Sequence, residues 1–149
     1  TVGLAEAIIK GQSPDGGLFM PTDFPEIHPS GIARMRGMPY AQLFTEVMGD
    51  FFKGVLSKRT LERIAHEAYN FETPIEEINH RNYIVRLDNG STGAFKDYAA
   101  QVLFRVVEAI MREEPQNEIE FRQRLKDIKL LTYIVAIKTS FMKMLSLGY

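Results

Sequence analysis

The stretch Asn89-Gly90-Ser91-Thr92-Gly93-Ala94-Phe95-Lys96-Asp97 joins two segments that differ in hydrophobic periodicity. Residues 83–87, before it, resemble a strand, and residues 95–112, after it, carry apolar side chains at helical spacing. Two glycines and two hydroxyl residues between these segments are typical of a tight loop. We therefore predict that a strand, a loop and a long helix meet here, with Lys96 in the first turn of the helix.

Lys96 would stand at a helix end where a cation is disfavoured, because the unsatisfied N–H groups and the dipole are positive there. This field, together with burial beside Phe95, is expected to favour the neutral amine. A neutral lysine is a nucleophile toward aldehydes. The same pattern also describes a surface lysine whose stem covers the helix start, and the local pattern alone favours that second interpretation.

Length and composition indicate one globular domain and exclude several kinds of site. The chain has 149 residues, a net charge of −1 and no cysteine. Disulfides, thiolate metal sites and cysteine nucleophiles are therefore excluded, and no basic face argues for nucleic acid. No apolar run is long enough to span a bilayer. We expect no nucleic-acid, membrane or metal partner, and a cytoplasmic location.

Periodicity predicts a helical first part and an α/β second part. Helices are expected at residues 2–10, 39–52 and 58–69, a short buried strand at Leu18–Met20, a loop at 22–38, and a single helical turn at 73–77. The later helix is apolar over more than half its circumference, so Leu103 and Val106 are expected in the core. With strands at 82–87 and 130–136, it forms a strand–helix–strand unit of a parallel sheet.

Two motifs resemble those of threonine synthases. Gly90–Asp97 is similar to the segment in which that family has His-Gly-Pro-Thr, then one residue, then Ala-Phe-Lys-Asp, with pyridoxal phosphate on the lysine. Leu4–Gly11, followed by Pro14-Asp15-Gly16-Gly17-Leu18-Phe19-Met20-Pro21, is similar to the family's N-terminal signature. The two matches occur in the family's order and at about its spacing. Asn89 and Ser91 depart from it, since the family usually has His and Pro there.

The resemblance implies a fold and an activity. Residues 1–80 would form the mainly helical N-terminal domain. Residues 81–136 would begin the mainly parallel, three-layer catalytic domain of a fold-type II enzyme that depends on pyridoxal phosphate. Residues 137–149 would be an unrelated tail. Lys96 would hold pyridoxal phosphate and carry protons in a lyase that converts O-phosphohomoserine and water to threonine and phosphate. Thr92 and Asp97 would order the loop.

The resemblance stops after Ala136. There threonine synthases continue into a Thr-Ser-Gly-Asp-Thr-Gly substrate loop, whereas this chain reads Ile137-Lys138-Thr139-Ser140. We therefore expect only the front part of the enzyme, as a truncated or frame-shifted product or an incompletely assembled coding sequence. The alternative is a catalytically inactive remnant or an interaction module. An unfinished sheet would expose an edge strand and an apolar face, which would favour self-association.

Overall fold

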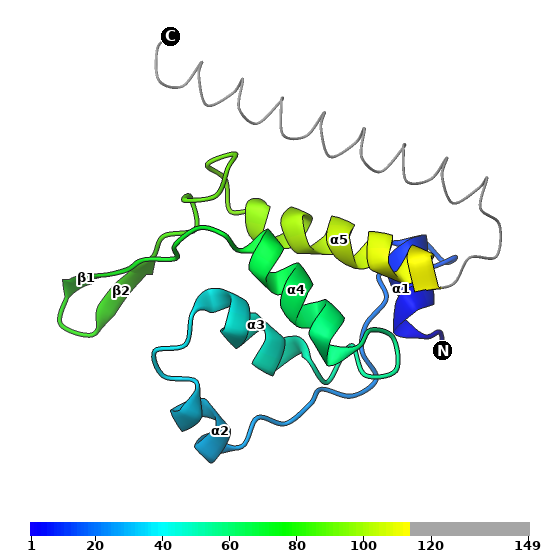
Figure 1. Ribbon diagram of the computed structural model, residues 1–149, viewed down its shortest axis with the longest axis horizontal. Helices are drawn as coiled ribbons and strands as arrows, with labels where there is room; N and C mark the ends of the chain where they lie inside the picture. Colours follow the sequence, from blue (N-terminus) through cyan, green and yellow to red (C-terminus); the bar gives the residue numbers. More distant parts are fainter. Residues whose placement is uncertain (114–149) are drawn as a thin grey trace, which may run out of the picture.

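The structure, a computed structural model, describes residues 1–113, whose arrangement is shown in Figure 1. In chain order the elements of this part are α1 (Leu4–Lys10), α2 (Pro29–Arg34), α3 (Tyr40–Met48), α4 (Lys58–Ala68), β1 (Ile75–Asn79), β2 (Asn82–Val85) and α5 (Asp97–Glu113). Helix α4 packs against both α3 and α5, and α1 packs against α5. The hairpin formed by β1 and β2 projects from one end of this helical group. The helices predicted at 2–10, 39–52, 58–69 and 95–112 are confirmed, with ends that differ by a few residues.

The core lies between α4 and α5. Its largest fully buried side chains are Leu61 and Ile64 on α4 and Val106 on α5. Apolar side chains of α1 and of the segment between α3 and α4 pack against these. Ser57 caps the N-terminus of α4: its hydroxyl oxygen accepts the N–H of Thr60 at 3.1 Å. Such a cap contributes about 1 kcal/mol. The helix that carries Leu61 and Ile64 therefore has a well-defined start.

Two predictions within residues 18–38 are wrong. Leu18–Met20 is not a buried strand, since Leu18 is 79% and Met20 72% exposed and no other strand of the described chain pairs with them. The predicted loop at 22–38 contains α2. Pro29 provides the first residue of α2, where its fixed φ suits a helix and its missing N–H is not needed. At six residues, α2 is too short to show an amphipathic period in the sequence.

The segment before β2 is a strand, so the helical turn predicted at 73–77 is wrong. β1 pairs with β2 in antiparallel register, with an irregularity between Glu77 and Asn79. The connection passes through Arg81, which has a φ of 66°. Beyond the strands, the N–H of Arg86 donates to the carbonyl of Pro74 at 2.9 Å, which extends the pairing toward the base of the hairpin. This pairing satisfies backbone groups that an isolated helical turn would leave open.

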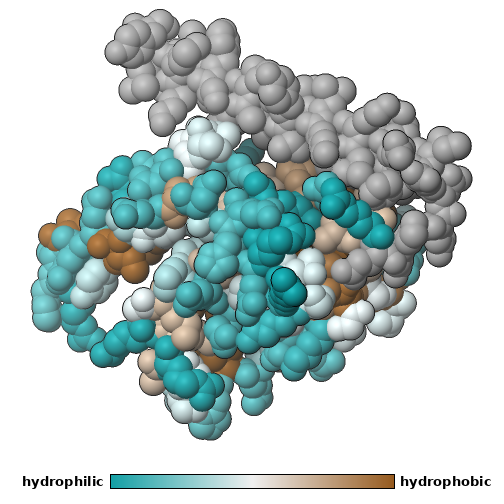
Figure 2. All heavy atoms as spheres, viewed as in Figure 1, coloured by the Kyte–Doolittle hydropathy of each residue, from teal (hydrophilic) through white to brown (hydrophobic). Residues whose placement is uncertain are grey.

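Helix α5, predicted to be apolar over more than half its circumference and therefore buried, has exposed apolar residues. Val106 is 2% exposed and lies in the core as predicted, whereas Leu103 is 46% exposed. The two residues are three positions apart, yet only Val106 faces α4. The placement of Leu103 in the core is therefore wrong. Figure 2 shows a mainly hydrophilic face with hydrophobic atoms in several places, one of them over the hairpin.

The predicted α/β fold class is confirmed as a mixed structure of helices and a small two-stranded sheet. The predicted second strand of the parallel unit, residues 130–136, and the predicted tail, residues 137–149, lie outside the described residues. In residues 1–113 no helix is long and apolar enough to cross a bilayer.

Candidate functional site

Lys96 lies in the turn that immediately precedes α5. Its carbonyl oxygen accepts the N–H groups of Ala100 at 2.8 Å and Ala99 at 3.1 Å, so the helix start fixes its backbone. Its side chain is exposed, and so is Phe95, at 65%. The expected burial of Lys96 beside Phe95 is therefore wrong. The next residue, Asp97, faces inward instead and is only 3% exposed.

The ion pairs of the lysines set Lys96 apart within residues 1–113. Each of the other lysines in this range has a carboxylate partner, whereas no ion pair there involves Lys96. The pairs are Lys10–Glu6 at 2.6 Å, Lys53–Asp50 at 2.7 Å, and Lys58 at 3.9 Å from both Glu46 and Glu62. Exposed pairs of this kind are weak, but they occupy the ammonium group. Among the described lysines, Lys96 therefore has the amine that is freest to meet an aldehyde or a phosphate.

Asp97 is the buried carboxylate beneath the loop. Its Oδ2 accepts the N–H of Thr92 at 2.8 Å, and the N–H of Gly93 donates to the carbonyl of Gly90 at 2.9 Å. Gly93 has a φ of 65°, a conformation that favours glycine. A Cβ added at Gly90 would lie 2.6 Å from the Cβ of Asp97 and would collide with its carboxylate. The close approach of the loop to Asp97 therefore requires glycine at position 90.

A chain of polar side chains connects α4 to the other side of the same loop. On α5, Nη1 of Arg105 donates to Oε1 of Gln101 at 2.8 Å, and Nε2 of Gln101 donates to the hydroxyl of Ser91 at 3.4 Å. Nε of Arg105 lies 3.6 Å from Oε2 of Glu67 on α4. The loop is thus held by the hydrogen bond between Thr92 and Asp97 and by the contact between Ser91 and Gln101 on α5.

An aromatic cluster lies at the junction of the helices, the hairpin and the loop. The ring of Tyr98 packs at 5.1 Å from Tyr40, 5.9 Å from Tyr69 and 5.2 Å from Phe71, measured between centroids. The hydroxyl of Tyr69 donates to the carbonyl of Tyr98 at 2.8 Å. Burial, and then the nearby phenols of Tyr40 and Tyr98, raise the pKa of Tyr69 well above its usual range. The cluster therefore favours the neutral phenol of Tyr69 and fixes the first turn of α5.

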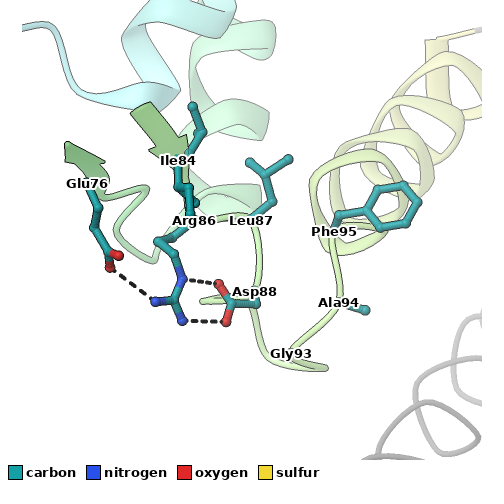
Figure 3. A pocket seen from close by; sticks show the side chains of 9 residues that line it. Glu76, Ile84, Arg86, Leu87, Asp88, Gly93, Ala94 and Phe95 are labelled. Atoms are coloured by element: carbon teal, nitrogen blue, oxygen red, sulfur yellow. Dashed lines mark hydrogen bonds and ion pairs between the residues drawn. The ribbon is translucent and has the colours of Figure 1, made fainter. Parts of the chain in front are cut away.

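An open hollow of about 550 Å³ lies between the hairpin and the loop. Figure 3 shows Arg86 on the hairpin side between Glu76 and Asp88, and residues 93–95 on the other side. Arg86 bonds Asp88 through Nε at 2.9 Å and Nη2 at 2.8 Å, and Glu76 through Nη1 at 3.1 Å. Hydrogen bonding to Asp88, followed by the charges of Asp88 and Glu76, raises the pKa of Arg86. Its guanidinium is already neutralised by two carboxylates. Lys96 follows the lining residues 93–95 directly but does not itself line the hollow.

Of the three residues that the sequence indicated, Thr92 and Asp97 are joined by a hydrogen bond, whereas Lys96 is next to Asp97 in the chain and has an exposed side chain. Sequence reasoning missed Tyr98 and Tyr69, which hold the helix that carries Lys96. The available signal was an aromatic residue directly after the Lys-Asp pair, but its partners Tyr69 and Thr73 lie more than twenty positions away in the chain. In residues 1–113 no cluster of three or more potential metal ligands occurs.

Comparisons with known proteins find similarity to one family. The model of the family described as "Threonine synthase N terminus" matches residues 1–69. Threonine synthase of Pseudomonas aeruginosa is 28% identical over 119 residues, covering 76% of this chain and 25% of the relative. Threonine synthase of Escherichia coli is 25% identical over 114 residues, with 76% and 27% covered.

A solved structure agrees with these sequence matches. The crystal structure of PLP-bound threonine synthase from Brucella melitensis is 29% identical, with a TM-score of 0.72, and the match covers 75% of this chain and 25% of that one. This chain thus spans about a quarter of the length of the relatives it matches. The resemblance predicted from the two motifs is confirmed: this chain is similar to threonine synthases over their N-terminal part.

Proposed function

We propose that this chain supplies the cofactor lysine of a threonine-synthase-type lyase. Lys96 would hold pyridoxal 5'-phosphate, and the reaction would convert O-phosphohomoserine and water to threonine and phosphate. The proposal is carried by one observation: the amine of Lys96 is exposed and has no ion-pair partner in residues 1–113, on a loop held by buried Asp97. The matched span covers 76% of the chain and so includes position 96 wherever it begins.

The residues at the loop fit this cofactor. Condensation of a lysine with the aldehyde of this cofactor requires an accessible amine, and Lys96 provides one just before α5. Pyridoxal phosphate, when bound, supplies an electron sink for the substrate carbons next to the amino group. The chain's own part would be to hold and orient it. Lys96 would accept and return the protons of those carbons, because a lysine amine at a fixed helix start can serve as base and acid in turn.

Thr92 and Asp97 would act by ordering rather than by chemistry. Asp97 is buried and its Oδ2 is directed at the backbone N–H of Thr92, so it has no direct path to a substrate. This contact keeps the turn at 90–93 closed against the first residue of α5. The orientation of the Lys96 side chain then depends on a backbone that is fixed on both sides.

A second candidate function is a binding module without catalytic activity. The observation that favours it is the exposure of apolar side chains on the hairpin, including Ile75 at 66%, Ile78 at 61% and Tyr83 at 59%. Exposed apolar groups on a two-stranded sheet with free edges favour association with another chain, including a second copy of this one. The expected cytoplasmic location stays a prediction under either function.

The two functions are separated by a phosphate-release assay with pyridoxal phosphate and O-phosphohomoserine. The catalytic proposal expects release by the parent chain and release at background level by Lys96→Ala and Lys96→Arg. Lys58→Ala removes an exposed, ion-paired lysine and should behave as the parent does. A folded parent chain that releases no phosphate, yet forms dimers or larger species in sedimentation, would favour the binding module.

A further inference from the structure

We infer that Tyr98 is a positioning residue for Lys96. Its hydroxyl ties the base of the hairpin to the first turn of α5, and thereby fixes the hollow and the lysine relative to each other. This inference rests on the proposed role of Lys96. It adds a supporting residue that does not line the hollow.

The hydroxyl of Tyr98 lies between two parts of the hairpin base. It is 2.8 Å from Oγ1 of Thr73, before β1, and 3.5 Å from the carbonyl oxygen of Arg86, after β2. A phenol that donates to the Arg86 carbonyl can accept the hydroxyl hydrogen of Thr73, so all three groups are satisfied together. The N–H of Arg86 in turn donates to Pro74. The Tyr98 hydroxyl therefore closes a ring of contacts at the hairpin base.

The other end of Tyr98 is fixed by the helical group. Its ring is packed among Tyr40, Tyr69 and Phe71, and its carbonyl accepts the Tyr69 hydroxyl. Its N–H donates to the carbonyl of Phe95 at 3.2 Å. The side chain cannot turn without breaking ring contacts, so the hydroxyl has one accessible position.

These contacts matter for Lys96 because Tyr98, which makes them, is two positions after Lys96 in the chain. Arg86 and Asp88 form one wall of the hollow, and residues 93–95, which lead directly into Lys96, form the other. In the described chain, Tyr98 is bonded to the hairpin wall through Arg86 and joined to the loop wall through Phe95. Loss of the hydroxyl would let the two walls move apart while leaving the core between α4 and α5 intact.

A double-mutant cycle tests this inference. Tyr98→Phe keeps the ring and removes the hydroxyl, and Thr73→Val keeps the volume of the partner and removes its hydroxyl. Tyr83→Phe, on the exposed hairpin, is the matched control. The 149-residue chain carries each change, and two quantities are measured: the dissociation constant for pyridoxal phosphate by absorbance, and hydrogen exchange of the amides of residues 86–97. Thermal unfolding verifies that every variant folds.

We expect both single variants to raise the dissociation constant by about twofold to tenfold, the usual effect of one hydrogen bond. Exchange at residues 86–97 should accelerate by a similar factor. The double variant should match Tyr98→Phe, because that change already removes the bond to Thr73 together with the contact to the Arg86 carbonyl. The control should not differ from the parent. Additive effects, or exchange that stays at the parent rate in both single variants, would overturn the inference.

The two proposals fail in different ways. If the parent chain shows no absorbance change with pyridoxal phosphate, the role of Lys96 fails, and the exchange rates alone then decide whether Tyr98 positions the loop. If the parent binds the cofactor and the single variants bind it equally well, the role of Tyr98 fails and that of Lys96 stands.

Discussion

Replacing Asp97 with alanine should destabilise the loop more than any other single change to a polar residue in its vicinity. Asp97 is 3% exposed and accepts the Thr92 N–H at 2.8 Å. The substitution removes the acceptor and leaves a partly buried N–H without its partner. It also removes a negative charge from the first turn of α5, where the helix dipole favours one.

The expected loss follows from these two contributions. A hydrogen bond to a charged group is worth about 1.5–3 kcal/mol. The charge at the helix start adds about 0.3–1 kcal/mol. Together they predict that Asp97→Ala lowers the free energy of unfolding by about 2–4 kcal/mol. Asp97→Asn keeps an oxygen acceptor and the volume but loses the charge, so its loss should be about half as large.

Urea unfolding followed by circular dichroism measures these differences. The matched control is Asp50→Ala, because Asp50 is an exposed aspartate whose ion pair with Lys53 should contribute less than about 1 kcal/mol. Hydrogen exchange at the Thr92 amide locates the effect and should accelerate strongly in Asp97→Ala. A loss no larger than that of Asp50→Ala, or an unchanged Thr92 amide, would show that the buried carboxylate does not order the loop.

Three further changes test the core, the aromatic cluster and the glycine contact. Val106→Asp places a charge in the core and should abolish the cooperative thermal transition, whereas Leu103→Asp, at an exposed position, should change stability by no more than about 1 kcal/mol. The raised pKa of Tyr69 favours its neutral form in the folded state, so the contribution of Tyr69 to stability should be constant below pH 10.0 and be lost as the pH rises above it. Urea unfolding at several alkaline pH values should show a smaller fall in Tyr69→Phe, and an identical fall would contradict the assignment. Gly90→Ala pushes a methyl group against Asp97 and should cost about 1–3 kcal/mol in the same assay.

The helices were predictable because their buried residues recur at helical spacing. On α4, Leu61, Ile64, Ala65 and Ala68 are all buried and form one stripe in the sequence. The burial of α5 was overestimated because an apolar residue such as Leu103 adds to the periodic pattern whether or not it is covered. Composition alone cannot tell a buried face from an exposed apolar one.

The hairpin was only half predicted, for a local reason. Every residue of β1 is exposed, so the strand has no alternation between buried and solvent-facing positions. The connection at His80–Arg81 has neither glycine nor an Asn-Gly pair, although Arg81 adopts the left-handed conformation that such turns require. The pair Glu76–Glu77 therefore suggested a helix start, and the long-range pairing with β2 decided otherwise.

The sequence indicated the residues of the candidate site but not the contacts that support them. The motif indicated Lys96, Thr92 and Asp97 by residue type and order. Their surroundings depend on contacts that join distant parts of the chain, such as the bond from Tyr69 to Tyr98, and no local pattern specifies these. The exposure of Lys96 likewise follows from which residue of the helix start is buried, and that residue is Asp97.

The most direct test of the central claim is to find which lysine binds pyridoxal phosphate. The chain is incubated with the cofactor near stoichiometry, reduced with borohydride and digested, and the modified peptides are quantified by mass spectrometry. The account predicts modification mainly at Lys96, with Lys10, Lys53 and Lys58 labelled far less, and loss of the label in Lys96→Ala. Equal labelling of exposed lysines, or a label that persists in Lys96→Ala, would contradict it.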